Sequence, residues 1–324
     1  MTSDPLFKTL ADIKARKIEW LWEPRIPYDK MTIMEGDPEL GKSYLCMHLA
    51  ALVTTGGSLP DGQIVEQGNV LYISSEDDAA DTIRPRMEQM GADLSRVRVL
   101  DGFLVRTEKG QEQLREEMEE FPPDLVVIDT LYSFLSDKVD LGKPTSIRAS
   151  LHALDRLFKE FGPAVIIIRH WTKGGKGKAI YRGVGSIDVI GVVRTGLVVA
   201  KHPENNNLRV LAQVKNNIGP KAQSLTYEIV PQKDGMPIIT WHGATNYTAD
   251  DLEMQGGRDG ESEYDRAVAF LKEALSGGPV QAPELFQRAA ELDISRPTLN
   301  RAKKEAGAVS KKKGKNWEWR LERG

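Results

Sequence analysis

The chain has 324 residues, of which 40% are apolar and 28% are charged, and its net charge is −3. This composition is typical of a globular protein and excludes fibrous and disordered classes, while no apolar run is long enough to span a bilayer. The N-terminal residues lack the apolar segment of a signal peptide, so we expect a cytoplasmic protein without membrane contacts. A single cysteine, Cys46, excludes an internal disulfide.

The first predicted strand, at residues 31–34, leads into a turn with the pattern of a phosphate-binding loop. In that pattern Lys42 reaches the β- and γ-phosphates, and the hydroxyl of Ser43 binds Mg²⁺. A helix predicted at residues 44–55 would add its N-terminal amides to the same site. We therefore expect ATP and Mg²⁺ to bind here, rather than a chance glycine-rich turn. The expected nucleotide-binding residues are Gly36, Asp37, Pro38, Glu39, Leu40, Gly41, Lys42, Ser43 and Tyr44.

Further short apolar runs follow, with helical stretches between them. The runs lie at residues 70–74, 97–100, 125–128, 164–168 and 196–200, and the helices at residues 79–90, 111–120 and 146–161. Such alternation indicates a parallel sheet covered on both faces. Three later runs alternate more strictly between apolar and polar residues and predict an antiparallel extension of the sheet. They lie at residues 208–215, 224–229 and 238–242. The predicted fold class is therefore α/β.

Carboxylates at strand ends supply the remaining chemistry of a nucleotide site. Asp129 closes the apolar run at residues 125–128, where a carboxylate holds Mg²⁺ through water, although a helix-capping role is the alternative. Glu76 follows the run at residues 70–74, on a strand that we expect beside the phosphate-loop strand, and is our candidate for the general base. Asp77 and Asp78 compete for that role, but we expect both to cap the following helix.

His170 ends the run at residues 164–168 and could sense the γ-phosphate. The glycine-rich stretch that follows contains basic residues and no acidic one up to Arg182. Such a loop can bind a phosphodiester backbone. Alternatively, His170 is a hydrogen-bonded residue at a strand end without a role in the site, and the basic loop is a solvent-exposed hairpin. The candidate DNA contacts here are Lys173, Lys176, Lys178 and Arg182.

A polar, glycine-rich stretch at residues 255–262 predicts a linker between an ATPase domain at residues 1–254 and a second domain at residues 263–324. Three predicted helices and a basic hairpin make this second domain a winged helix. Residues 296–324 contain ten Lys or Arg and three Glu, a net charge of +7. The charge favours nucleic-acid binding, and a protein contact or a solvated tail is the alternative. The candidate DNA contacts are Arg296, Arg301, Lys303 and Lys304.

The order of the motifs GDPELGKS, YISSEDD, DLVVIDT, RHWTKGG, RGVGSID and VKNNIGP resembles the RecA-like ATPases of the RepA/DnaB replicative helicase group, in particular the short ATPases encoded near primases in prophages and plasmids. The resemblance covers residues 20–251. It implies a homo-oligomeric ring, usually a hexamer, with ATP between subunits and single-stranded DNA in the central hole. A separate primase or replication initiator is an implied partner.

The resemblance also implies roles for individual residues. Lys42 and Ser43 would bind phosphate and Mg²⁺, and Asp129 would orient the metal. Glu76 would be the catalytic carboxylate and His170 the γ-phosphate sensor. Arg86 would lie near the nucleotide, and residues 173–182 would face DNA.

One departure from the family concerns a Lys-x-Arg pair whose arginine acts in the neighbouring subunit's site. Here the pair reads Lys215 and Asn217, and asparagine cannot supply the positive charge. Lys215 acting alone, Arg194 and Arg209 are the candidates for that role.

The sequence thus favours an oligomeric, ATP-dependent, DNA-binding ATPase that works as a ring-forming replicative helicase or a helicase-like motor of a mobile element. Two alternatives stay open. The first is a recombination mediator that forms filaments on single-stranded DNA. The second is a regulatory DNA-binding protein that uses ATP only as a switch.

Overall fold

The computed structural model describes residues 9–101, 108–131, 144–171, 186–233, 235–256, 263–292, 294–303, 305–313 and 316–321. The chain divides into two compact units, Met1–Glu253 and Met254–Gly324. No helix within these described ranges has both the length and the apolarity needed to cross a membrane.

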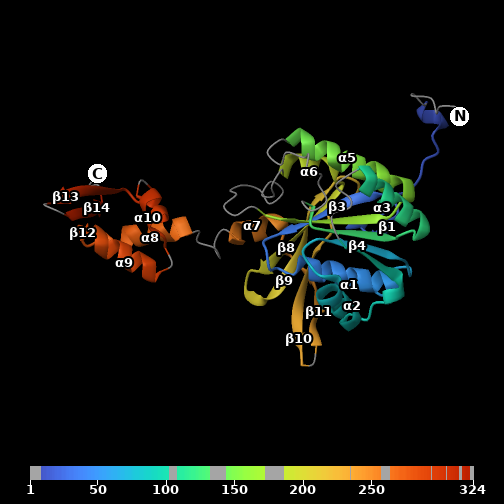
Figure 1. Cartoon of the computed structure of the whole chain (residues 1–324), viewed down its shortest axis with the longest axis horizontal. Helices are drawn as coiled ribbons and strands as arrows, with labels where there is room; N and C mark the ends of the chain where they lie inside the picture. The colour runs from blue at the N-terminus through green and yellow to red at the C-terminus, as the bar shows by residue number, and fades with distance from the viewer. Residues whose placement is uncertain are drawn as a thin grey trace. The chain divides into compact units, whose positions relative to one another are not determined.

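The first unit is built around one mixed sheet, which contains nine strands among the described residues (Figure 1). Its parallel strands are β3 (Lys30–Gly36), β4 (Val70–Ser74), β5 (Val97–Asp101), β6 (Leu125–Asp129), β7 (Ala164–His170) and β8 (Thr195–His202). The antiparallel strands are β9 (Asn205–Asn216), β10 (Ser224–Gln232) and β11 (Gly235–Thr245). The predicted α/β class and mainly parallel sheet are confirmed.

The order of strands across the sheet is β11-β10-β9-β8-β3-β7-β6-β4-β5. Two strands, β7 and β6, therefore lie between β3 and β4, and the prediction that β4 neighbours β3 is wrong. The reason is the path of the chain after β6. It crosses over and forms β7 directly beside β3, where Glu35 aligns with Arg169. These two side chains are fully buried and form an ion pair.

Helices cover both faces of the sheet (Figure 1). Alternate residues of β7 show how one strand supplies two cores. Ile166 and Ile168 pack into the apolar cluster that contains α1 and α2, while Val165 and Ile167 pack into the cluster with α3, α5 and α6. A strand buried on both faces therefore reads as a continuous apolar run. The helices are α1 (Lys42–Thr55), α2 (Arg84–Gln89), α3 (Glu108–Glu120), α5 (Pro144–Phe161), α6 (Ser186–Val192) and α7 (Ala249–Gly256).

The helix predicted at residues 79–90 is instead divided into η2 (Ala79–Ile83) and α2. Pro85 lies in the first turn of α2, where a missing N–H group is tolerated, whereas it would interrupt the hydrogen bonds of one continuous helix. Shorter elements complete the unit. They are η1 (Leu10–Asp12), η3 (Leu94–Arg96) and a two-stranded sheet of β1 (Trp20–Trp22) and β2 (Ile26–Pro27).

The second unit contains three helices and a small antiparallel sheet with the order β12-β14-β13. Leu271, Leu285, Leu299 and Trp319 lie at the centre of its own apolar core. Ser295 caps the third helix as predicted, because its hydroxyl accepts a hydrogen bond from the N–H of Thr298. The elements are α8 (Glu263–Ala274), β12 (Val280–Gln281), α9 (Ala282–Glu291), α10 (Arg296–Ala302), β13 (Ala308–Lys313) and β14 (Asn316–Leu321).

Candidate functional site

The turn between β3 and α1 is a narrow loop held against β8 and β10. A Cβ atom on Gly36 would lie 2.3 Å from the carbonyl oxygen of Val199 in β8. Gly41 has φ +79, and its Cβ would lie 2.2 Å from Cδ1 of Ile229 in β10. Gly36 has φ +151, so glycine is required at both positions by space and by backbone conformation. No side chain caps the N-terminus of α1, so its first N–H groups face the loop without a capping partner.

Lys42, the first residue of α1, places a buried ammonium group inside this loop. Its side chain is 3% exposed, and Nζ donates to the carbonyl oxygens of Gly36 at 3.1 Å and Asp37 at 2.7 Å. Burial lowers the pKa of Lys42 to about 8, while the nearby carboxylate of Asp129 opposes this shift. The group is therefore still charged at neutral pH, in a loop whose shape suits a phosphate.

Asp129 ends β6 and receives two hydroxyl hydrogen bonds. The hydroxyl of Tyr72 donates to Oδ2 at 3.1 Å, and that of Ser43 also bonds the carboxylate. Burial raises the pKa of Asp129 to about 6. The Oδ1 atom is buried and has no hydrogen-bond partner among the described residues. A hydroxyl beside a carboxylate with a spare oxygen fits Mg²⁺ bound together with phosphate oxygens.

The described residues contain no group of three or more His, Cys, Asp or Glu side chains that could enclose a metal by itself. This agrees with the way Mg²⁺ is usually held, by one or two protein ligands, phosphates and water. Ser43 and Asp129 are the residues that would hold it.

Glu76 lies two residues after the end of β4 and meets side chains from two other strand ends. The hydroxyl of Thr130, after β6, donates to Glu76 Oε1 at 3.2 Å. His170, at the end of β7, places Nε2 3.7 Å from Glu76 Oε2. Burial, followed by the positive charge of Lys42, lowers the pKa of His170 and favours its neutral form. The sheet thus brings Glu76, Asp129 and His170 to one edge, although their strands are far apart in the sequence.

The acidic residues that follow Glu76 have different partners. Asp78 caps η2, since Oδ1 accepts hydrogen bonds from the N–H groups of Ala80 and Asp81. The expectation that Asp77 is also a cap is wrong, because its Oδ2 instead accepts from Arg86 at 3.0 Å.

Arg86 also lies over an aromatic ring, with its guanidinium carbon 5.2 Å from the ring centre of Tyr44. Because Tyr44 follows Ser43 in α1, this contact places Arg86 at the start of the helix that leaves the phosphate loop.

Lys215, which the sequence predicts as a nucleotide ligand, lies away from the loop of its own chain. It pairs in β9 with Gly196 of β8, beside the middle of β3. Its ammonium group donates to the carbonyl oxygens of Ile190 and Val193, which precede β8 at the amino edge of the parallel strands. The N–H of Asn217 donates to the carbonyl oxygen of Arg194 at 3.1 Å.

Arg194 is exposed at this same edge, which is opposite to the edge that carries the phosphate loop. Arg209 lies further along β9, opposite Lys201 of β8 and Tyr227 of β10. Of the two candidate arginines, Arg194 is therefore the one beside Asn217.

Two of the predicted DNA contacts lie over aromatic rings of the second unit. Arg296 lies with its guanidinium carbon 5.0 Å from the ring centre of Phe286. The Nζ atom of Lys303 lies 3.7 Å from the ring centre of Trp319. Arg301 belongs to α10, but its side chain is not described. The remaining candidates lie outside the described residues: Lys173, Lys176, Lys178, Arg182 and Lys304.

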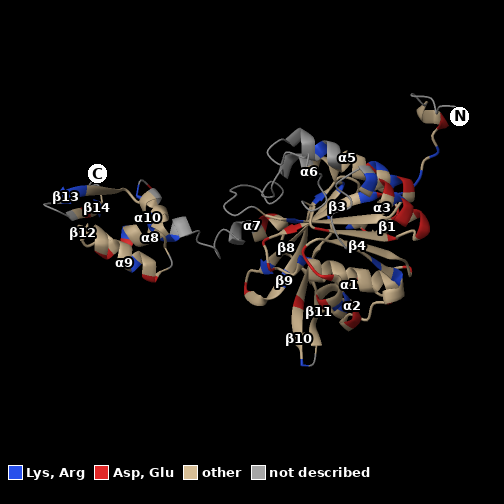
Figure 2. Ribbon diagram, viewed as in Figure 1, with Lys and Arg blue, Asp and Glu red and all other residues tan. Residues whose placement is uncertain are grey.

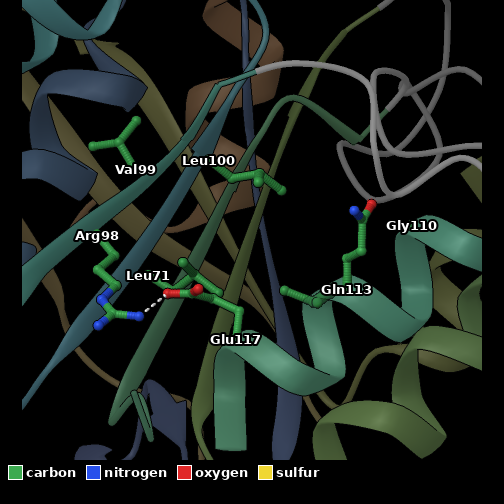
Figure 3. A pocket seen from close by; sticks show the side chains of 8 residues that line it. Leu71, Arg98, Val99, Leu100, Gly110, Gln113 and Glu117 are labelled. Atoms are coloured by element: carbon green, nitrogen blue, oxygen red, sulfur yellow. Dashed lines mark hydrogen bonds and ion pairs between the residues drawn. The ribbon is translucent and has the colours of Figure 1, made fainter. Parts of the chain in front are cut away.

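A surface pocket of about 390 Å³ lies between the edge strand β5 and α3 (Figure 3). An ion pair of 2.5 Å between Arg98 and Glu117 crosses it. Because β7, β6 and β4 separate β5 from β3, this pocket is not part of the cluster around the phosphate loop. Its lining residues are Leu71, Arg98, Val99, Leu100, Gly110, Gln113, Leu114 and Glu117.

Sequence reasoning missed the hydroxyl partners of the two carboxylates. Thr130 was detectable as the residue after Asp129, since it occupies the same strand tip. Tyr72 carries no such signal, because a tyrosine within an apolar strand looks like a core residue.

A strand that leads into a glycine-rich loop and helix, with a carboxylate at the tip of a second parallel strand, defines a RecA-like P-loop ATPase. The chain belongs to the AAA domain family, whose match spans residues 5–176. The solved structure of a KaiC-like protein from Pyrococcus horikoshii OT3 has the same core fold. Its TM-score is 0.50 at 15% sequence identity, over 68% of this chain and 96% of that one.

Curated relatives include two proteins named "DNA repair protein RadA". The one from Brucella abortus (strain 2308) is 26% identical over 204 residues, covering 61% of this chain and 38% of its own. The one from Streptococcus pneumoniae (strain ATCC BAA-255 / R6) is 25% identical over 191 residues, covering 58% of this chain and 40% of its own. The chain therefore spans about two fifths of the length of these relatives.

Proposed function

We propose that this RecA-like ATPase is an oligomeric, DNA-dependent motor, of the kind found in ring-forming replicative helicases of mobile elements. The observation that carries the proposal is the cluster at the carboxyl edge of the sheet. There, Lys42 and Asp129 lie at a phosphate loop, and Glu76 contacts both Thr130 and His170. The motif order that resembles the RepA/DnaB group supports the helicase assignment.

Each residue of the cluster has a role in phosphoryl transfer to water. The loop amides and Lys42 hold the β- and γ-phosphates in place. Glu76, oriented by Thr130 and His170, accepts a proton from the attacking water. A bound Mg²⁺ would neutralise phosphate charge, held by Ser43 and Asp129. Because His170 contacts Glu76, the presence of a γ-phosphate near His170 would alter the position of the base.

The position of Lys215 and Arg194 supports a site shared between subunits. Both lie at the edge of the sheet opposite to the phosphate loop of the same chain. In a head-to-tail ring, this edge would face the phosphate loop of the next subunit. Arg194 would then supply the positive charge that Asn217 cannot.

The second unit supports a role on DNA. Its order of one helix, a short strand, two helices and a two-stranded hairpin is typical of a winged helix and supports that assignment, and its last residues carry a net charge of +7. We take residues 1–254 as the ATPase domain, 255–262 as the linker and 263–324 as the winged helix. Single-stranded DNA is the proposed partner of the ring, with a primase or replication initiator as a protein partner in the cytoplasm.

A recombination mediator that forms filaments on single-stranded DNA is the second candidate, and the similarity to proteins named for DNA repair favours it. Negative-stain images with ATP and single-stranded DNA separate the two, since closed rings support the motor and open helical filaments support the mediator.

ATP turnover tests the proposal directly. We expect a turnover rate per subunit that rises with protein concentration and with added single-stranded DNA. Lys42→Ala should abolish nucleotide binding in a folded protein. A wild-type rate that is independent of both variables contradicts a shared, DNA-stimulated site, and leaves the ATP-switched regulator as the better description.

A further inference from the structure

Trp317 lies in β14, on the face of the β13–β14 hairpin that also carries the buried Trp319, but beyond the part of that face that the core covers. Its side chain is 51% exposed, whereas the other five tryptophans of the chain are buried or partly buried. Large aromatic side chains are normally packed, because burying one removes a large apolar area from water. An indole that stays exposed is therefore a candidate for contact with a ligand.

Lysine side chains surround Trp317 on the same face of the hairpin. Lys312 is its direct cross-strand neighbour, and Ser310 is the neighbour of Trp319 two residues further along β14. Cross-strand neighbours project from the same face of a sheet, and residues two apart lie about 7 Å from one another along it. Lys312, Ser310 and Trp317 therefore form one continuous row of exposed residues.

Lys303, just after α10, extends this row. Its Nζ atom lies 3.7 Å from the ring centre of Trp319 and 3.2 Å from the hydroxyl oxygen of Ser310. Both contacts fix the lysine on the same face of the hairpin as Trp317. We call the surface formed by Lys303, Ser310, Lys312 and Trp317 the hairpin face.

The charge around the hairpin face is positive. Figure 2 shows the basic residues of β13. Lys312 is exposed on the hairpin face, whereas Lys311 pairs across the strands with Glu318 on the other face. Glu318 projects from the other face of β14, where its Oε1 accepts from Gln281 at 3.4 Å. A flat aromatic ring beside lysines is the arrangement that binds an unpaired base together with its phosphates.

We propose that the hairpin face binds single-stranded nucleic acid, with one base stacked on Trp317 and the adjacent phosphates bound by Lys312 and Lys303. A duplex fits less well, because its bases are already stacked on each other and do not expose a face to the indole. The proposal rests on the DNA-binding function proposed above, and it assigns the contact to the hairpin rather than to α10 alone.

Fluorescence anisotropy with labelled oligothymidine and with a labelled duplex tests the site in the full-length protein. Trp317→Ala should weaken single-strand binding by about tenfold, while Trp317→Phe, which keeps a ring, should stay within about threefold of wild type. Lys312→Ala should weaken binding and reduce the slope of log affinity against log salt by about 0.7. Lys233→Ala removes a lysine from an exposed turn of the first unit and should change neither quantity.

Intrinsic fluorescence gives a second readout, which a purely structural role would not alter. Stacking of a base on Trp317 should quench the emission of this one exposed indole, and Trp317→Phe should remove that quenching while binding persists. An unchanged circular dichroism spectrum and an unchanged urea unfolding transition show that the second unit of Trp317→Ala is folded.

The outcomes separate this inference from the proposed function. If wild type binds oligothymidine but Trp317→Ala binds it equally well, or if quenching persists in Trp317→Phe, the hairpin face is not the site. Tighter binding of duplex than of single strand also overturns the inference. If wild type binds no oligonucleotide at all, the DNA-binding function itself fails.

Discussion

The Nε2 atom of His170 lies 3.7 Å from the Oε2 atom of Glu76, although β6 separates the strands that carry the two residues. The contact joins the candidate general base to the candidate γ-phosphate sensor. Thr130, from the strand between them, donates to the other oxygen of the same carboxylate. Glu76 is thus oriented by groups from the tips of β6 and β7.

Glu76→Gln should leave nucleotide binding intact and reduce turnover by a factor of about 100 to 10,000, because the amide cannot accept the proton of the attacking water. Single-turnover hydrolysis and binding of a fluorescent nucleotide measure the two steps separately. Asp77→Asn is the matched control, since Asp77 pairs with Arg86 and not with His170. Normal hydrolysis by Glu76→Gln, or an equal loss in Asp77→Asn, would contradict the assignment of the base.

Magnesium-dependent nucleotide binding should weaken as the pH falls through about 6, because burial raises the pKa of Asp129 to about 6 and a protonated carboxyl is a poor metal ligand. The expected loss is about tenfold at one pH unit below that value. Affinity measured from pH 8 to pH 5 checks it. Asp129→Asn should bind the nucleotide weakly at every pH and should not show this loss of affinity near pH 6. Titration of the nucleotide itself affects both proteins equally, so the difference between them reports Asp129.

The same group has the opposite effect on stability. Burial raises the pKa of Asp129 in the folded chain from its ordinary value of 3.8 to about 6, so between these two pH values the folded state binds this proton more tightly than the unfolded state. Its contribution to the free energy of unfolding therefore rises as the pH falls from about 6 to about 4. A loss of binding at low pH thus need not reflect unfolding at this site.

Gly36→Ala should lower the free energy of unfolding of the first unit by about 3 kcal/mol, because the new Cβ would meet the carbonyl oxygen of Val199 at 2.3 Å. Urea unfolding followed by circular dichroism measures the change. Gly62→Ala is the control, since Gly62 has φ +87 but no atom within 4 Å of its Cβ position. Backbone strain alone predicts about 1 kcal/mol there. Equal effects at both positions would show that the loop is not tightly held against β8.

Arg194→Ala should reduce turnover per subunit by at least about tenfold, and Asn217→Arg should raise turnover, if this edge completes the neighbouring subunit's site. Mixing gives the decisive measurement. Arg194→Ala and Lys42→Ala are each expected to be inactive, but a mixed oligomer contains some sites with an intact loop and an intact arginine. Activity should therefore reappear on mixing. No recovery, in mixtures shown to co-assemble, would place Arg194 outside the site, and Arg209→Ala then tests the other candidate.

Local patterns were sufficient for the phosphate loop and for the strand that ends at Asp129. Their function depends on a strand followed by a turn, and neighbouring residues in the sequence specify both. The apolar runs also predicted a sheet buried on both faces, because such burial removes the alternation of polar and apolar residues.

The order of strands was harder to predict, because it depends on where each crossover returns rather than on the strands themselves. No pattern in the neighbouring residues therefore predicted that β7 lies between β3 and β6. The Asp77–Arg86 pair could not be predicted for the same reason, because the packing of the helices determines which side chains meet. Glu35 and Arg169 are 134 residues apart in the sequence and meet only through this strand order.

The buried Glu35–Arg169 pair has a mechanical consequence. Glu35 precedes Gly36, where the phosphate loop starts, and Arg169 precedes His170. Pulling the pair apart would strand two charges in an apolar interior, at a cost of roughly 3–5 kcal/mol. The ion pair thus holds the start of the phosphate loop next to His170, and it opposes sliding of β3 along β7. In the proposed motor, a movement that follows loss of phosphate would therefore rotate β3 and β7 together rather than slide one strand along the other.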